Sequence, residues 1–195
     1  ESSVLRPVIG EVLEAYRPIR EQEVNKKASR AKRVEIIEIP RPSLFFTDNY
    51  EEMKAKRCAM EPFYVGKEMV VNEKDFIKFL DENNNIEWWY KNGDSGSEYF
   101  SISYYNQDEN KEKLFYPDWV VKTKNKIWII DTKAGFTAES NDTKYKAEAL
   151  QEWLKGRKGL EGGIAVKDAN GWKINQNKEY SYSPAMNGWS VLRIL

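Results

Sequence analysis

Two short apolar runs constrain the fold of this chain more than any other feature. Residues 115–121 (FYPDWVV) and 127–133 (IWIIDTK) are rich in β-branched and aromatic side chains, and the five residues that join them are polar. This pattern predicts two antiparallel strands connected by a turn. The second run is apolar on both of its alternating faces until its last residues, which is typical of a central strand covered on both sides.

Charged residues gather where this hairpin opens. A turn at the middle of the linker pairs Val121 with Trp128 and places Asp118 opposite Asp131. Opposed residues share one face of a sheet and lie roughly 4.5–5.5 Å apart at Cβ. Lys133 projects to the same face because it lies two residues beyond Asp131. The register therefore predicts a pair of carboxylates beside an amine, whereas a slip of one residue would send Asp118 to the other face.

Such a pair of carboxylates at strand ends is typical of a site for a hard divalent cation. Mg²⁺ prefers oxygen ligands, which Asp118, Asp131 and the backbone carbonyl of Thr132 would supply. A bound metal ion lowers the pKa of its water and stabilises charge on a scissile phosphate. Lys133 would orient that water and stabilise the same charge. The alternative interpretation is a structural cluster of ion pairs.

The rest of the chain predicts a mixed α/β domain. Asn72 is placed to cap a helix over 73–82 that carries Glu73 on its inward face as a further metal ligand. A second helix over 143–155 carries Lys146, which we expect at the strand end with Asp131; Lys146 and Lys91 would bind phosphates. Strands are expected at 86–90, 100–104, 163–166, 172–174 and 189–195, with a loop after residue 134 and a helix at 50–60. Residues 1–70 are interpreted as an N-terminal extension and 71–195 as the main domain.

Missing residue types narrow the chemistry. The chain contains no histidine and one cysteine, Cys58. This excludes an intrachain disulfide, catalysis that depends on histidine, and zinc held by histidine or by several thiolates. It also fits a reducing, cytoplasmic setting, and no apolar run is long enough to span a membrane. The net charge is zero, although basic residues outnumber acidic ones between positions 111 and 160.

At this point the motifs resemble a known family. Tyr116-Pro117-Asp118 followed by Asp131-Thr132-Lys133 is similar to the PD-(D/E)xK nuclease motif. A wider set of stretches resembles the C-terminal endonuclease domain of type III restriction-enzyme Res subunits and related helicase–nucleases. Those stretches are residues 72–77, 88–92, 116–120, 130–133 and 146–150, and the resemblance covers about residues 70–175.

The resemblance implies a restriction-endonuclease-like fold, in which helices lie on either side of a mixed sheet, and cleavage of double-stranded DNA that depends on Mg²⁺, for which Mn²⁺ would substitute. The metal ligands carry over to Asp118 and Asp131, the catalytic lysine to Lys133, and the helix acid to Glu73. Nucleases of this kind follow a helicase motor, whereas this sequence has no GxxxxGK phosphate loop and does not begin with Met. We therefore expect an excised nuclease domain whose residues 1–70 connect to an upstream helicase region.

In an intact enzyme the expected partners are DNA, the helicase region and a modification subunit, and dimerisation would allow both DNA strands to be cut. Two other functions compete. One is a catalytically inactive nuclease-like module that binds DNA or a partner subunit. The other is a glycosidase with paired carboxylates, which Lys133 disfavours because its charge would lower the pKa of a carboxyl that must act as a general acid.

Overall fold

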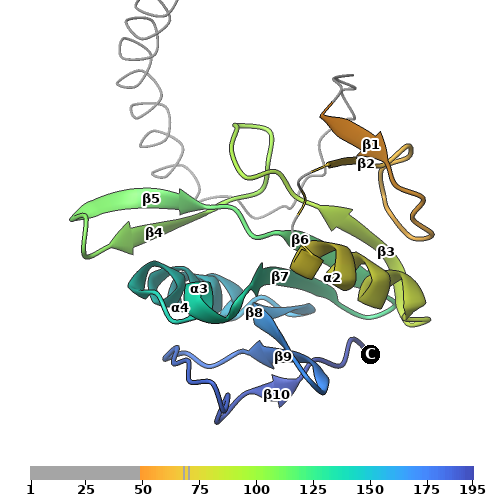
Figure 1. Cartoon of the computed structure of the whole chain (residues 1–195). Coiled ribbons are helices and arrows are strands. Elements are labelled where there is room, and N and C mark those ends of the chain that lie inside the picture. The colour runs from red at the N-terminus through yellow and green to blue at the C-terminus, as the bar shows by residue number, and fades with distance from the viewer. Residues whose placement is uncertain (1–48, 68, 70) are drawn as a thin grey trace, which may run out of the picture.

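A six-stranded mixed sheet forms the centre of the fold (Figure 1). The structure is a computed structural model that describes residues 49–67, 69 and 71–195. The sheet order is β10-β9-β8-β7-β6-β3, in which β7 and β8 are parallel and all other neighbours are antiparallel. Its strands are β3 (Ile86–Lys91), β6 (Trp119–Thr123), β7 (Ile127–Lys133), β8 (Leu160–Asp168), β9 (Gly171–Asn175) and β10 (Ser190–Val191).

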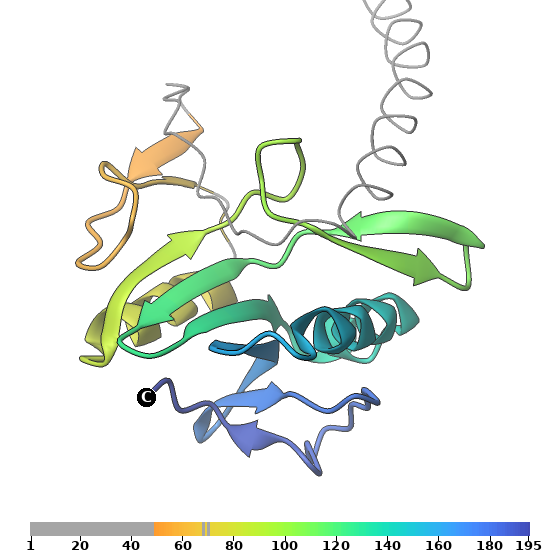
Figure 2. The same cartoon turned by 180° about the vertical axis from the view of Figure 1, so that it is seen from behind.

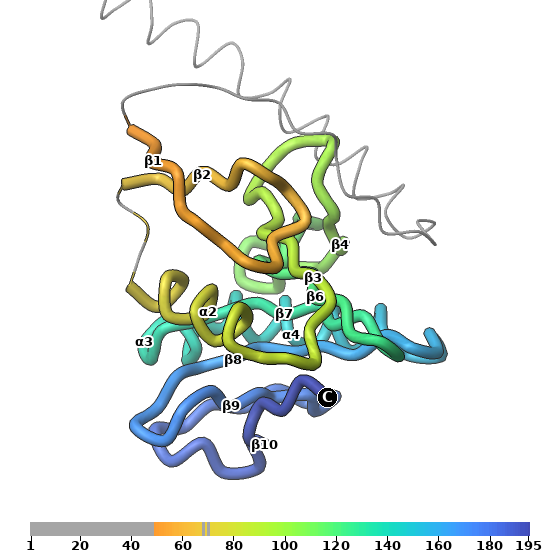
Figure 3. The backbone as a smooth tube through the Cα atoms, turned by 90° about the vertical axis from the view of Figure 1, so that its right-hand side faces the viewer, coloured from red at the N-terminus to blue at the C-terminus, as the bar shows by residue number. Residues whose placement is uncertain are grey.

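Helices and two small hairpins surround this sheet. The helices are α2 (Val71–Glu82), α3 (Gly135–Ala138) and α4 (Asn141–Leu154). One hairpin consists of β1 (Tyr50–Glu52) and β2 (Tyr64–Gly66), and the other of β4 (Ile102–Asn106) and β5 (Lys111–Phe115). Figure 3 shows β1 and β2 at one end of the molecule and β9 and β10 at the other. The predicted mixed α/β architecture is confirmed at this level.

The central hairpin has the predicted register. Val121 pairs with Trp128 and Val120 with Ile129 in the β6–β7 ladder. The five residues at positions 128–132 of β7 are all buried. The prediction of a central strand covered on both faces is therefore confirmed.

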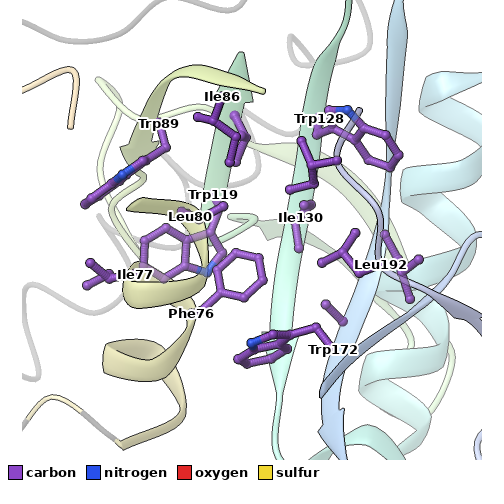
Figure 4. Close-up of a cluster of buried hydrophobic side chains, with 14 residues drawn as sticks. Phe76, Ile77, Leu80, Ile86, Trp89, Trp119, Trp128, Ile130, Trp172 and Leu192 are labelled. Carbon is purple, nitrogen blue, oxygen red and sulfur yellow. The ribbon is translucent and has the colours of Figure 1, made fainter. Parts of the chain in front are cut away.

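One face of the hairpin packs against α2. Alternate residues of the two strands, including Trp119 and Ile130, join Phe76 and Leu80 of the helix in one buried cluster (Figure 4). The Phe76 ring lies edge-on to Trp172 of β9, with 4.7 Å between ring centroids. This aromatic packing fixes the position of α2, whose first turn carries Glu73.

The other face of the hairpin packs against α4. Val120 and Ile129 belong to a second buried cluster with Leu150 of that helix. Figure 2 shows α4 in front of the sheet and α2 behind it. Because β7 and β8 are parallel, α4 provides the crossover connection that such a pair needs. Each face of the central hairpin is therefore covered by one helix.

Several predicted boundaries are wrong. The first strand of the hairpin begins at Trp119 rather than at residue 115, because residues 111–115 pair with β4 as a separate strand. A short helix, α3, occupies the expected loop after residue 134. Asn72 lies inside α2 instead of capping it, and its side chain donates to the Lys133 carbonyl at 3.3 Å.

The described part of the N-terminal extension packs on the sheet. The predicted helix at 50–60 is wrong, since this segment contains β1 and an irregular stretch. Backbone hydrogen bonds join it to β3: Trp89 N–H donates to the Arg57 carbonyl at 2.8 Å, and Ala59 N–H donates to the Trp89 carbonyl at 2.7 Å. Residues 1–48 of the predicted extension lie outside the described residues, and the domain boundary at residue 70 stays a prediction.

Candidate active site

Four elements bring their ends together at one place. Lys91, the last residue of β3, pairs with Trp119, so Asp118 lies next to it. Trp119 also pairs with Ile130, which brings Asp118 beside the carboxyl end of β7. Glu73 in the first turn of α2 completes the group, because its carboxylate pairs with Lys91. Strand pairing and one helix therefore assemble residues from distant parts of the sequence.

Asp118 is held in a fixed orientation. Its Oδ2 accepts hydrogen bonds from the Thr132 backbone N–H at 2.9 Å and from the Thr132 hydroxyl at 2.8 Å. Its Oδ1 lies 2.9 Å from Lys91 Nζ. Burial acts to raise the pKa of Asp118, but attraction to Lys91 and Lys133, together with these hydrogen bonds, holds that pKa below its usual value. Asp118 is therefore a carboxylate at neutral pH.

Asp131 has a different environment. Its side chain is only 2% exposed, and Lys133 Nζ lies 2.5 Å from its Oδ2. The Lys133 ammonium is therefore the charge partner of this oxygen, at hydrogen-bond distance. Burial raises the pKa of Asp131 to about 6, the charge of Asp118 adds to the shift, and Lys133 opposes it. The predicted proximity of Lys133 to Asp131 is confirmed.

Lys91 bridges two acids. Its Nζ lies 2.9 Å from Glu73 Oε1 and 2.9 Å from Asp118 Oδ1. Burial acts to lower the pKa of Lys91, but the charges of Asp118 and Glu73 more than compensate, and the pKa lies above its ordinary value. The ammonium also lies 5.0 Å from the centre of the Trp119 ring. This bridge was not predicted from the sequence. The expected binding of phosphates by Lys91 stays a prediction.

Asn92 forms a buried support behind Asp118. Its side-chain amide donates to the carbonyls of Phe100 at 2.8 Å and Pro117 at 3.0 Å, and its side-chain oxygen accepts from Phe100 N–H at 3.2 Å. Its backbone N–H donates to the Asp118 carbonyl at 2.7 Å. The sequence does not reveal this role of Asn92, because Asn-Gly is an ordinary turn signal.

Lys146 pairs with an acid of its own helix. Its Nζ lies 2.6 Å from Asp142 Oδ2, one turn earlier on α4. Asp142 Oδ1 also accepts from the Tyr104 hydroxyl at 2.7 Å and from Asn106 Nδ2 at 3.0 Å. Lys146 is still close enough for its charge to lower the pKa of Asp131. The predicted approach to Asp131 is thus an effect of charge without contact, and the phosphate-binding role stays a prediction.

An exposed aromatic side chain follows the site. Phe136 of α3 lies three residues after Lys133 and is 83% exposed. Two hydrogen bonds hold α3 in place: the Thr143 hydroxyl donates to the Thr137 carbonyl, and the Tyr180 hydroxyl donates to the Ala138 carbonyl. No sequence signal separated this aromatic residue from the many buried ones.

The donor set suits Mg²⁺ in part. Among residues 49–67, 69 and 71–195, no group of three or more His, Cys, Asp or Glu side chains is arranged to hold a metal ion. Asp118 and Asp131 nevertheless lie next to the last β6–β7 pair, Trp119 and Ile130, and the charge of Asp118 contributes to the raised pKa of Asp131. A backbone carbonyl and water would have to complete the oxygen ligands that Mg²⁺ requires.

Comparison with known proteins adds no relative: no family model, no curated protein and no solved structure matches this chain. The helices of the part that the structure describes are all too short or too polar to cross a membrane.

Proposed function

We propose that this chain is a metal-dependent endonuclease domain that hydrolyses DNA phosphodiester bonds. The observation that carries the proposal is the state of Asp131. A buried carboxylate with a second carboxylate nearby and a pKa raised to about 6, in spite of the Lys133 ammonium beside it, is unfavourable for stability. Such an arrangement is common at functional sites, where charged groups are held ready for a ligand.

Asp118, Asp131 and the Thr132 carbonyl would hold a Mg²⁺ or Mn²⁺ ion, with Glu73 as a further ligand. The ion would activate a water molecule and stabilise charge on the phosphate. Thr132 keeps the Asp118 carboxylate oriented through its two hydrogen bonds. Lys133, which is kept protonated because its pKa lies above the ordinary value, would orient the water and stabilise the developing charge. Burial acts to lower the pKa of Lys133, but the charges of Asp131 and Asp118 more than compensate.

The wider proposal follows from the motif resemblance. Tyr116-Pro117-Asp118 and Asp131-Thr132-Lys133 support membership of the PD-(D/E)xK nucleases, and the mixed sheet with a helix on each face fits the restriction-endonuclease-like fold which that resemblance implies. On this proposal the domain serves a type III restriction enzyme or a related helicase–nuclease. Its partners would be double-stranded DNA, an upstream helicase region and a modification subunit.

Cleavage of supercoiled plasmid tests the activity. The full chain would be incubated with plasmid and Mg²⁺ or Mn²⁺, beside Asp131→Ala and Lys133→Ala. Lys122→Met is a matched control, because Lys122 forms an ordinary ion pair with Glu87 at 3.4 Å near the opposite end of β6 from Asp118. We expect nicking or linearisation by the wild type and the control only. Equal nicking by all four proteins would exclude this site.

A second candidate function is a catalytically inactive module that binds DNA or a partner subunit. Two observations favour it. Lys91 forms ion pairs with both Asp118 and Glu73, and within the described residues no cluster of three acids is arranged for a metal ion. DNA binding in a gel-shift assay, unchanged by Asp131→Ala and with no cleavage under any metal, would support this function. Dimerisation stays a prediction for either function.

A further inference from the structure

The Lys91 ammonium occupies the place where a cation would bind two of the proposed metal ligands. Its Nζ lies 2.9 Å from both Glu73 Oε1 and Asp118 Oδ1, two oxygens that come from different elements. The three side chains are each only about one-fifth exposed, so water screens their charges poorly. One positive charge therefore holds two negative charges together.

We propose that Lys91 is a built-in counter-ion that exchanges with the metal ion. In the metal-free protein it holds Glu73 and Asp118 in place, and a divalent ion displaces it when the site is loaded. This inference rests on the proposed metal site and assigns to Lys91 a positioning role. The displaced ammonium is then free to contact a phosphate, which is the role that the sequence predicts for Lys91.

Competition for the same oxygens makes the exchange necessary. A carboxylate oxygen at ion-pair distance from an ammonium must release it before a cation can bind at about 2.1 Å, the distance Mg²⁺ demands. Metal binding in the wild type is therefore weakened by the free energy of breaking the Lys91 bridge.

The surroundings allow Lys91 to move without leaving the site. Its stem is long and flexible, and its ammonium lies near the face of the Trp119 ring, 5.0 Å from the centre. An aromatic face attracts a cation, so the ring favours an ammonium that stays beside the site when it leaves the two carboxylates. Trp119 itself is fully buried and cannot move aside.

Mn²⁺ binding by the full chain tests the exchange, measured by calorimetry and by thermal unfolding with and without Mn²⁺. We expect Lys91→Met to bind Mn²⁺ about tenfold more tightly than the wild type, because the competing cation is gone. We also expect it to unfold at a lower temperature in EDTA and to recover in Mn²⁺. Lys122→Met, whose ion pair with Glu87 lies near the other end of β6, should match the wild type in both measurements. If Lys91→Met does not fold without metal, Lys91→Gln replaces it, since an amide can still donate to one acid.

The outcomes separate this inference from the proposed function. Equal or weaker Mn²⁺ binding by Lys91→Met, with clear binding by the wild type, would overturn the exchange and leave the metal site standing. Destabilisation that Mn²⁺ does not relieve would also overturn it, because a lysine with only a structural role has that effect. If no variant binds Mn²⁺ at all, the metal site fails, and the exchange fails with it.

Discussion

Asp118 and Thr132 join the two strands of the central hairpin beyond their last paired residues. The Asp118 carboxylate accepts from the Thr132 backbone N–H at 2.9 Å and from its hydroxyl at 2.8 Å. The same hydroxyl lies 3.3 Å from the indole N–H of Trp119, which donates to it. Thr132 thus orients a proposed metal ligand and also supplies a hydrogen-bond acceptor for the indole N–H of the buried Trp119.

Thr132→Val should destabilise the fold and disturb the site. Valine keeps the shape of threonine but removes the hydroxyl, so Asp118 loses one hydrogen bond and Trp119 Nε1 loses its acceptor. We expect a loss of about 2 kcal/mol in the free energy of unfolding, which urea denaturation would measure. Thr132→Ser keeps the hydroxyl and should lose less than half as much. No loss in Thr132→Val would show that the hydroxyl contributes nothing, and a loss in Thr132→Ser as large as in Thr132→Val would show that the methyl group matters as much as the hydroxyl.

Asp131 should make the protein less stable as the pH rises. Its pKa is about 6 in the folded protein, above the value of about 3.9 in an unfolded chain. The folded state therefore binds the proton more tightly, and the stabilisation present below pH 4 is lost as the pH rises through 6. A shift of about two pKa units corresponds to about 3 kcal/mol at pH 8.

Asp131→Asn tests this sign, because asparagine imitates the neutral acid. We expect the variant to be more stable than the wild type by up to about 3 kcal/mol at pH 8 and nearly equal at pH 4, in urea titrations with EDTA present. A variant less stable than the wild type at pH 8 would contradict the unfavourable charge inferred for Asp131.

Asp118→Asn should have the opposite effect. The pKa of Asp118 is lower in the folded protein than usual, because Lys91, Lys133 and two hydrogen bonds outweigh its burial. Its stabilisation is present above the unfolded pKa and is lost as the pH falls through the folded one. At pH 8 we expect a loss on the order of 2 kcal/mol, the usual cost of losing a charge-assisted hydrogen bond. The loss should shrink toward pH 3, and a loss independent of pH would contradict the assignment.

The register of the central hairpin could be predicted because one side-chain pattern carries it. Two apolar runs around a short polar linker allow few pairings, because the length of the connecting turn fixes which residues lie opposite each other. The convergence of Asp131 and Lys133 followed directly, since residues two apart on a strand share a face. Glu73 was predicted to lie on the inward face of its helix for the same kind of local reason; its carboxylate pairs with Lys91 of β3, and its role as a metal ligand stays a prediction.

The parts that failed depend on contacts between distant segments. Strand β5 was not predicted, because its pairing with β4 does not show in its own residues. The ion pair of Lys146 with Asp142 could not be predicted either, because Tyr104 and Asn106, which hold Asp142 in place, come from a distant strand, β4. The bridge made by Lys91 likewise needs β3, β6 and α2 together.

Gly162→Ala should destabilise the sheet beside the site. A Cβ at this position of β8 would lie 2.0 Å from the backbone carbonyl oxygen of Ile129 in β7, the strand that carries Asp131. Backbone cannot yield as a side chain does, so the strands must separate, at a cost of about 1–3 kcal/mol or more. Gly66→Ala is the matched control, because an added Cβ there meets nothing within 4 Å. Urea denaturation should show a large loss for Gly162→Ala and almost none for Gly66→Ala. A loss in Gly162→Ala no larger than in the control would mean that β7 and β8 lie further apart than the structure has them.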